Sequence, residues 1–294
     1  MPRTIVSTGM ELEYDTFGSA DDPALLLVMG FTAQMIQWDE PFCQMLADTG
    51  LFVIRYDNRD CGLSSHLDGV EVDIAAAMGA AFAGGEMPAV AYTLSDMAAD
   101  GIGLLDHLGI VGAHVMGASM GGMIVQTMAI EHPERVLSLT SVMSTVGDIE
   151  YGQAAPEVMA VLIAPPPASR DEYIAASPNW MVWQSKKYSS EQRVKELAAV
   201  SYDRSFYPEG SPRQLAAILA SGDRSDALAQ LDVPTLVIHG RDDTLITPSG
   251  GLRTAELVPG AHLLFVADMG HDMPEPLWPL FVDAIASHTR RAAD

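Results

Sequence analysis

Short apolar runs alternate along the chain with longer stretches in which apolar residues recur every three or four positions. The runs predict buried strands, and the stretches predict helices with one buried face. Strands that are apolar throughout and alternate with helices are typical of a mostly parallel sheet covered by helices on both faces. The expected strands are 11–17, 25–29, 52–56, 113–116, 137–143, 235–239 and 263–266, and the expected helices are 34–48, 94–108, 120–130, 251–257 and 277–288.

Two segments interrupt this alternation. Residues 145–232 contain no clear strand pattern, but they hold three consecutive prolines at 165–167 and a helical pattern at 194–200. We therefore expect a helical cap at 145–232, inserted into an α/β core that consists of 1–144 and 233–294. Residues 73–90, which are rich in Ala, Gly and Met, predict a mobile loop or a short helix near the mouth of the site.

Net charge is the feature of the composition that excludes most partners. The 294 residues include 16 Lys and Arg against 39 Asp and Glu, which gives a net charge of −23. Such a chain offers no basic field for phosphates, which argues against nucleic acid and anionic lipid as partners. The hydrophobic fraction of 48% is enough for a folded domain and excludes a disordered chain. The oligomeric state stays open, and a homodimer is compatible with this composition.

Cysteine usage and hydropathy bear on the compartment. Cys43 and Cys61 are too few for a disulfide framework and lack the spacing of a zinc site. The start of the chain lacks the apolar segment of a secretory signal, and the longest aliphatic run, 24–29, is far shorter than the ~20 residues that cross a bilayer. These features predict a cytoplasmic protein with reduced thiols, without a metal site and without a membrane partner.

The segment Gly117-Ala-Ser-Met-Gly121 lies between an expected strand and an expected helix. This is the context in which Gly-x-Ser-x-Gly forms a nucleophile elbow, a sharp turn that lifts the serine above the sheet. Glycine is needed on both sides because the turn brings backbones close together. The turn also puts Ser119 at a helix N-terminus, where free N–H groups favour an anion. We predict that Ser119 is a catalytic nucleophile.

A serine nucleophile needs a general base, and the base needs an acid that orients it. In this architecture the acid and then the histidine follow the serine along the chain. His271 lies in a loop after the expected strand 263–266, at the sheet edge where such sites gather, and is the predicted base. The other histidines after Ser119 lie at helix or strand ends or in the last helix: His132, His239, His262 and His288.

The acid and the oxyanion hole follow from the ends of two other strands. Asp242 and Asp243 both follow the strand 235–239, and either one can accept a hydrogen bond from His271. The backbone N–H groups of Met120, the residue after the serine, and of Phe31, in the loop after the strand 25–29, are the predicted oxyanion donors.

Together these residues resemble the α/β-hydrolase superfamily over nearly the whole chain, and 145–232 matches least. The stretch 55–64, Arg-Tyr-Asp-Asn-Arg-Asp-Cys-Gly-Leu-Ser, is similar to the Asp-x-Arg-x-x-Gly-x-Ser signature of the branch with cofactor-free haloperoxidases, esterases and proline iminopeptidases. The resemblance implies that Asp57 and Arg59 hold a turn together. It also favours Asp243 over Asp242 as the acid, because the Gly-x-x-Asp of the family falls on Asp243.

The match is strongest to carboxylesterases of the aclacinomycin methylesterase type, through Val28-Met29-Gly30, the stretch 55–64 and the long cap. The Gly-His of the family falls on Gly270-His271. Most relatives carry His-Gly where this chain has Met29-Gly30, but the methylesterase type shares Met-Gly. Haloalkane dehalogenases and epoxide hydrolases are excluded because they need Asp at position 119.

These features predict a serine hydrolase that cleaves a small-molecule carboxylic ester through an acyl-enzyme, without a metal or an organic cofactor. Lactonases, amidases or aminopeptidases, C–C bond hydrolases and perhydrolases share the same triad and stay open as alternatives. A non-catalytic ligand-binding relative is disfavoured because serine, acid and histidine are all present in the right order. The expected substrate-binding residues are Met35, Trp38, Trp180 and Trp183, and the acidic residues that keep an aminopeptidase open are Glu150, Glu157, Asp171 and Glu172.

Overall fold

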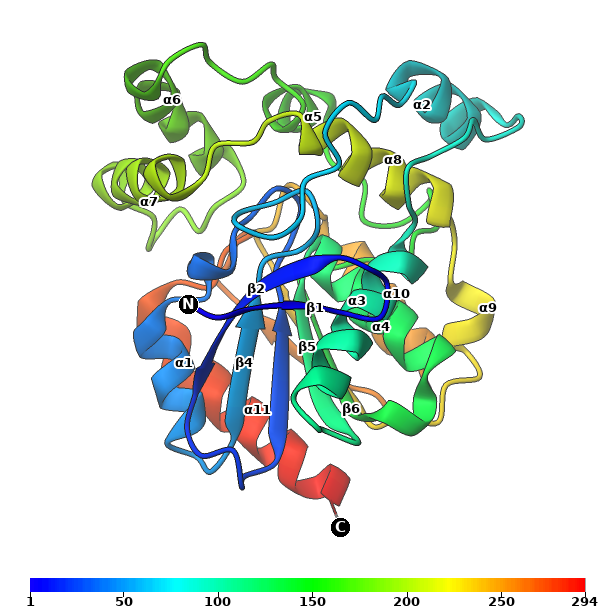
Figure 1. Cartoon of the computed structure of the whole chain (residues 1–294), viewed down its shortest axis with the longest axis vertical. Coiled ribbons are helices and arrows are strands. Elements are labelled where there is room, and N and C mark those ends of the chain that lie inside the picture. Colours follow the sequence, from blue (N-terminus) through cyan, green and yellow to red (C-terminus); the bar gives the residue numbers. More distant parts are fainter. Residues whose placement is uncertain (294) are drawn as a thin grey trace.

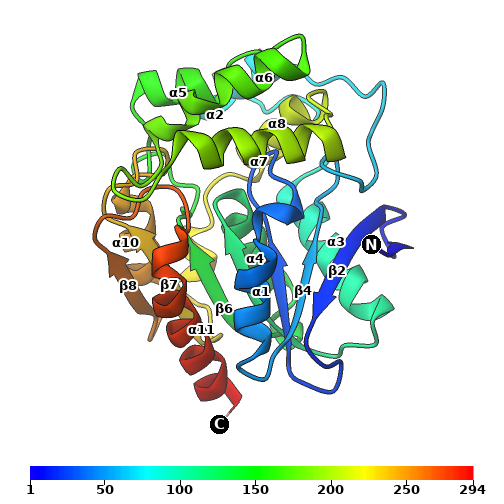
Figure 2. The ribbon, with the colours of Figure 1, turned by 90° about the vertical axis from the view of Figure 1, so that its left-hand side faces the viewer.

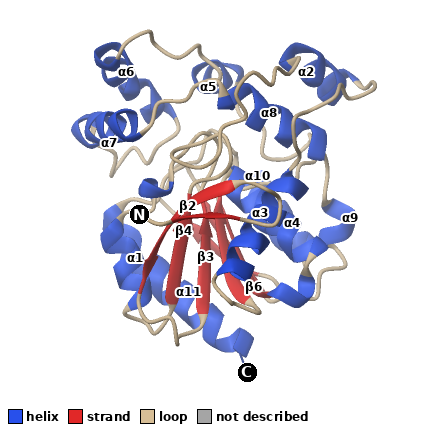
Figure 3. Cartoon of the chain, in the orientation of Figure 1, coloured by secondary structure: helices blue, strands red, loops and turns tan. Residues whose placement is uncertain are grey.

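The computed structural model, which describes residues 1–293, contains one sheet of eight strands in the order β1-β2-β4-β3-β5-β6-β7-β8 (Figures 1 and 3). β1 and β2 are antiparallel to their neighbours, and all other pairs are parallel. This mostly parallel sheet confirms the predicted fold class. The strands are β1 (Arg3–Ile5), β2 (Glu11–Phe17), β3 (Ala24–Val28), β4 (Phe52–Tyr56), β5 (Ala113–Ala118), β6 (Val136–Val142), β7 (Thr235–Gly240) and β8 (His262–Val266).

Helices cover both faces of the sheet, which is why the central strands are apolar throughout. Leu25 and Leu27 of β3 pack in a buried cluster with α1 (Glu40–Ala47) and α11 (Trp278–Ala293). The alternate residues, Leu26 and Val28, pack in a second cluster on the opposite face. The helices of that face are α3 (Leu94–His107), α4 (Met120–Glu131) and α10 (Pro248–Leu257).

One predicted helix is divided in the structure. The expected helix 34–48 is a short 3₁₀ helix, η1 (Met35–Gln37), followed by α1. Trp38 has an extended conformation between them, and Pro41 lies in the first turn of α1. Proline has a backbone suited to the start of a helix but cannot donate within a continuous one, so the helix begins anew at that point. This division decides where the side chains of the segment point.

The chain between β6 and β7 is helical in the region of the predicted cap (Figure 2). These helices form a layer over the carboxyl ends of the strands, and α2 (Ile74–Ala83), from the segment 73–90, packs on α8 (Gly210–Ser221) in the same layer. The limits of the cap at 145 and 232 stay a prediction, and we call the segment the helical insertion. Its elements are α5 (Pro156–Leu162), α6 (Arg170–Ala176), η3 (Ser177–Val182), α7 (Glu191–Arg204), α8 (Gly210–Ser221) and α9 (Ser225–Leu228). Within residues 1–293, no helix combines the length and the apolar character that a membrane span requires.

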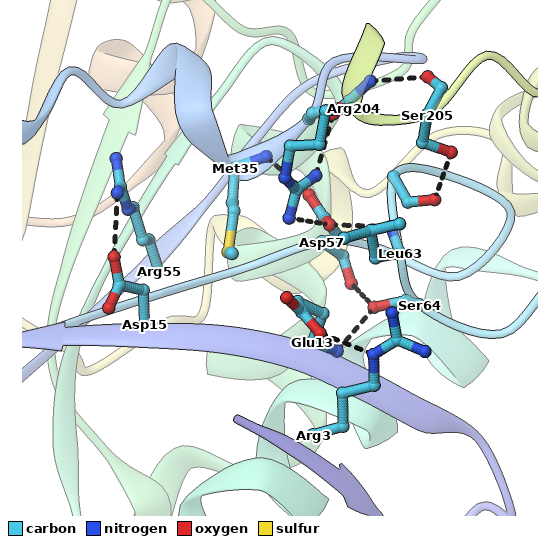
Figure 4. Close-up of polar contacts among 12 residues, drawn as sticks. Arg3, Glu13, Asp15, Met35, Arg55, Asp57, Leu63, Ser64, Arg204 and Ser205 are labelled. Carbon is cyan, nitrogen blue, oxygen red and sulfur yellow. Dashed lines mark hydrogen bonds and ion pairs between the residues drawn. The ribbon is translucent and has the colours of Figure 1, made fainter. Parts of the chain in front are cut away.

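Buried ion pairs tie the helical insertion to the loop after β4. Arg204 at the end of α7 places Nη2 2.7 Å from Oδ2 of Asp57, whose other oxygen accepts the N–H of Met35 at 2.7 Å (Figure 4). Arg213 of α8 donates to both oxygens of Asp60 at 2.8 and 2.9 Å. Both carboxylates are buried. Within residues 1–293, the cations paired with these two carboxylates of the loop after β4 both come from the insertion.

A third buried pair holds the same loop to the core. Arg59 donates to both oxygens of Asp100 in α3, at 2.6 and 2.7 Å. Asp57 also accepts the N–H of Leu63 at 2.9 Å, within its own turn. These contacts fit the structural role that the family resemblance implies for Asp57 and Arg59.

We expect Arg213→Ala to lower the free energy of unfolding by about 3–5 kcal/mol, because the substitution leaves the Asp60 carboxylate buried and unpaired. Urea unfolding checks this. The matched control is Arg170→Ala, which removes an exposed pair with Asp203 and should leave the unfolding midpoint nearly unchanged. Equal effects of the two substitutions would contradict the importance of the buried pair.

Two buried histidines make stability depend on pH. Burial lowers the pKa of His114 on β5 and of His288 on α11 to about 4. Both side chains therefore stay neutral in the folded chain at any pH well above 4. In the unfolded chain, histidine binds a proton near its usual pKa of 6.5. His288 Nε2 lies 3.2 Å from the carbonyl oxygen of Leu139.

We expect the free energy of unfolding to decrease as the pH falls from about 6.5 to about 4, because the unfolded state then binds more protons than the folded state. His288→Gln keeps a donor for Leu139 but does not titrate, so its stability should fall less steeply over this range. Urea unfolding at a series of pH values measures both slopes. Identical slopes for the two proteins would count against this origin of the pH dependence.

Candidate active site

Ser119 lies in a strained turn between β5 and α4. Its φ of 57° is in the left-handed region, which costs a non-glycine residue about 1–3 kcal/mol. Two hydrogen bonds from the end of β6 oppose this strain. The Ser119 N–H donates to the carbonyl of Val142 at 2.9 Å, and the Ser144 hydroxyl donates to the carbonyl of Ser119 at 2.8 Å.

The glycines of the turn allow backbones to approach where no side chain fits. A Cβ on Gly117 would lie 2.0 Å from the carbonyl oxygen of Gly121, and a Cβ on Gly121 would lie 2.1 Å from that of Val28 in β3. A Cβ on Gly30 would lie 3.0 Å from the Cβ of Ser119. The loop after β3 is therefore packed directly against the serine.

Both predicted oxyanion donors lie beside Ser119 on the wall of one cavity. Met120 is the first residue of α4, where a helix leaves its N–H groups without intrahelical acceptors. Phe31 is in a turn closed by the Ala33 N–H, which donates to the Gly30 carbonyl at 3.2 Å. Within residues 1–293, no acceptor receives the Phe31 N–H. Both N–H groups are thus available to a ligand.

His271 is hydrogen-bonded to Asp243 rather than to Asp242. His271 Nδ1 lies 2.7 Å from Oδ2 of Asp243, which is only 2% exposed. The second oxygen of Asp243 accepts the N–H groups of Leu245 and Ile246 at 2.9 and 3.0 Å, so the carboxylate has one orientation. Asp242 is exposed, and its N–H donates to Met269. The structure thereby separates the two candidates that the residues alone left open.

A second histidine lies beside this pair and has a structural position. His239 Nε2 is 2.9 Å from the carbonyl oxygen of Ile246 and 3.6 Å from Oδ2 of Asp243. Burial lowers the pKa of His239, which keeps the ring neutral, so its Nε2–H donates to Ile246. This agrees with the sequence-based assignment of His239 as a strand-end residue.

The loop that carries His271 is held by the helical insertion. The N–H of His271 donates to the carbonyl of Trp183 at 2.7 Å, and the N–H of Gly270 donates to the Ser185 hydroxyl at 2.9 Å. A Cβ on Gly270 would lie 2.5 Å from the Trp183 carbonyl oxygen, which explains the glycine before the histidine.

Ser185 and Asp272 are two supporting residues that the sequence analysis missed. The Ser185 backbone N–H donates to Asp272 at 2.9 Å, and its hydroxyl donates to the same oxygen. Burial raises the pKa of Asp272. The only signal in the sequence is the position of Asp272 directly after His271, because Ser185 lies far away along the chain.

A cavity of about 1360 Å³ separates the strand ends from the helical insertion, and Ser119 and His271 both line it. Trp180 and Trp183 of the insertion also line it, as expected. Trp38 contributes to the wall, although it is only 2% exposed. Its ring stacks on that of Phe42, with 6.2 Å between the ring centroids.

The expectation for Met35 needs correction. Its side chain is fully buried in η1, and within residues 1–293 it is not part of the cavity wall. The physical reason is the break before α1, which turns Met35 into the core and leaves Trp38 at the cavity. The segment 73–90, in contrast, reaches the cavity as expected, through Ala81 and Phe82 of α2.

The acidic residues that kept an aminopeptidase open lie elsewhere. All four are exposed, and among the described residues none of them belongs to the cavity wall: Glu150, Glu157, Asp171 and Glu172. These four positions therefore do not offer the cavity a carboxylate for the free amine of an aminopeptidase substrate.

A family profile and several known proteins are similar to this chain in sequence. The sequence profile of the family described as alpha/beta hydrolase fold matches residues 23–275. The chain is 28% identical over 313 residues to rhodomycin D methylesterase of Streptomyces sp. (strain C5), with 99% of this chain and 98% of the relative covered. It is 28% identical to 3-oxoadipate enol-lactonase 2 of Acinetobacter baylyi, with 84% and 82% covered.

A solved structure shows the same fold at lower identity. The meta-cleavage product hydrolase of Pseudomonas fluorescens IP01 aligns with a TM-score of 0.77 and 19% identity, over 99% of this chain and 98% of that one. The similarity to a methylesterase confirms the resemblance to that branch, which the sequence motifs indicated. The match over residues 23–275 shows that the chain belongs to the α/β-hydrolase family.

Proposed function

We propose that the chain is a serine hydrolase that cleaves a carboxylic ester through an acyl-enzyme. The observation that carries the proposal is the convergence on one cavity of Ser119, two free backbone donors and a histidine bonded to a buried carboxylate. This set supplies a nucleophile, an oxyanion site and a general base with its orienting acid. No step of this chemistry needs a metal or an organic cofactor.

The proposed reaction begins with attack of Ser119 Oγ on the ester carbonyl while His271 Nε2 accepts its proton. Asp243 accepts the hydrogen bond from Nδ1–H and stabilises the imidazolium. The N–H groups of Phe31 and Met120 receive the negative oxygen, a kind of contact whose loss costs ~10²–10³ in turnover. The alcohol leaves with the proton from His271, and water then cleaves the acyl-enzyme by the same route.

The size of the cavity bears on the substrate class. At about 1360 Å³ it exceeds the ~300–1,000 Å³ typical of small-molecule sites, which favours an ester with a bulky component. The relative in Streptomyces sp. (strain C5) is named a methylesterase. We therefore propose an ester of a bulky acid with a small alcohol, contacted by Trp38, Trp180 and Trp183.

We expect Ser119→Ala to lower turnover of p-nitrophenyl esters at least about 10³-fold, because the residual rate then depends on binding and the oxyanion donors alone. The measurement is a chain-length series from acetate to decanoate, with fluorophosphonate labelling of the wild type. The matched control is Ser95→Ala on α3, whose hydroxyl bonds Glu131 away from the cavity and which should retain full activity.

Turnover that survives in the Ser119→Ala variant would refute the nucleophile. Labelling of Ser119 without turnover of the p-nitrophenyl esters, or of a methyl ester of a bulky acid, would refute the proposed ester substrate and leave the triad in place. A lactone and a meta-cleavage product would then be the next substrates, because one relative is named an enol-lactonase and one protein of the same fold is named a meta-cleavage product hydrolase.

Asp243→Asn should lower turnover by about 10³- to 10⁴-fold, because an amide cannot stabilise the imidazolium and favours the wrong tautomer of His271. Asp242→Asn changes an exposed neighbour and is the matched control, with activity expected within about threefold of wild type. Steady-state kinetics on the best ester compares them. A larger loss of turnover for Asp242→Asn than for Asp243→Asn would assign the role of the acid to Asp242 instead.

A further inference from the structure

Thr32, in the loop that carries the proposed oxyanion donor Phe31, has an unfavourable backbone conformation. It is the third residue of the turn Gly30–Ala33 and has a φ of 56°. This position with positive φ normally selects Gly or Asn, and for a β-branched residue it is an outlier. Such a conformation persists only where the surroundings impose it.

The contact that imposes it comes from the helical insertion. The Thr32 N–H donates to Oε1 of Gln214 in α8 at 2.8 Å. Nε2 of the same amide donates to the carbonyl oxygen of Arg59 at 2.9 Å, in the loop after β4. Gln214 is fully buried, and both ends of its amide are bonded. The side chain is therefore a fixed bridge between the insertion, the oxyanion loop and the core.

The insertion also holds the far end of the same loop. Gln34 donates to the carbonyl oxygens of Ser201 and Ser205 at 2.7 Å each, and its own oxygen accepts from Arg204 at 2.8 Å. Gln214 and Arg204 thus contact the loop on either side of Ala33. No comparable side-chain bond reaches the N–H of Phe31 within residues 1–293, so the insertion holds this loop through the contacts at Thr32 and Gln34, which both follow Phe31 along the chain.

We infer that Gln214 is a positioning residue that sets the oxyanion-donor geometry of Phe31 by holding Thr32 in the left-handed conformation. Without an acceptor for its N–H, the peptide between Phe31 and Thr32 rotates to relieve the strain, and the backbone beside the Phe31 N–H moves with it. Docking of the insertion on the core and assembly of the oxyanion hole are then one event. The inference rests on the proposed function of the site.

The first test is Gln214→Met, which keeps the volume of the side chain and removes the acceptor. We expect kcat to fall about 10- to 100-fold with KM within about threefold, because a misplaced donor affects the transition state more than the bound ester. The matched control is Ser221→Ala on the same helix. Its hydroxyl accepts the N–H of Leu94 at 2.9 Å and thus also joins the insertion to the core, but away from the oxyanion loop.

A double-mutant cycle with Thr32→Gly separates positioning from general support of the fold. Glycine adopts a positive φ without strain, so the turn no longer needs Gln214. We expect the loss of kcat caused by Gln214→Met to shrink to less than about threefold in the Thr32→Gly background. A role of Gln214 in holding α8 alone predicts the same loss in both backgrounds and would overturn the inference.

Unchanged kcat in a folded Gln214→Met enzyme, with turnover that still depends on Ser119, would overturn the inference and leave the proposed function intact. Turnover independent of Ser119 would overturn the proposed function instead. If Gln214→Met does not fold, as judged by thermal unfolding, Gln214→Asn decides. It keeps a buried amide but withdraws it from Thr32, so the same loss of kcat is expected, and its absence overturns the inference.

Discussion

Close contact between the backbones of two strand ends and one helix start is the constraint on which the site depends. The turn after β5 passes so near β3 and the start of α4 that Gly117 and Gly121 have no space for a side chain. This contact forces Ser119 into the left-handed region and brings the loop after β3 against it. The proposed nucleophile and the N–H of Met120 are therefore positioned by backbone packing, whereas the loop that carries Phe31 is also held by side chains of the helical insertion.

The helical insertion does more than cover the cavity. Two of its arginines neutralise buried carboxylates of the loop after β4, and its residues 183–185 hold the loop that carries His271. A buried pair contributes little net stability but is costly to break, so such pairs fix one arrangement of the parts. The core carries the candidate catalytic residues, and contacts with the insertion hold the loops between them.

Proteins similar to this chain in sequence or fold are named a methylesterase, an enol-lactonase and a meta-cleavage product hydrolase. A fold of this kind carries many chemistries because the reacting groups stay on the sheet while the covering segment changes. In this chain the covering segment supplies Trp180 and Trp183 and much of a cavity of about 1360 Å³. The part of the sequence with the least regular pattern therefore lines much of the cavity.

The sequence by itself determined every strand except β1, the helices that cover the sheet, the elbow at Ser119 and the candidate base His271, because local periodicity and glycine spacing encode them. The residues alone left Asp242 and Asp243 as alternatives, since neighbouring side chains point in opposite directions and only the packed loop shows which one meets His271. The helical pattern of residues 34–48 also did not predict the break at Trp38 or the burial of Met35. Gln214 and Ser185 had no sequence signal at all, because their partners Thr32 and Gly270 lie 182 and 85 residues away and meet them only when the insertion packs on the core.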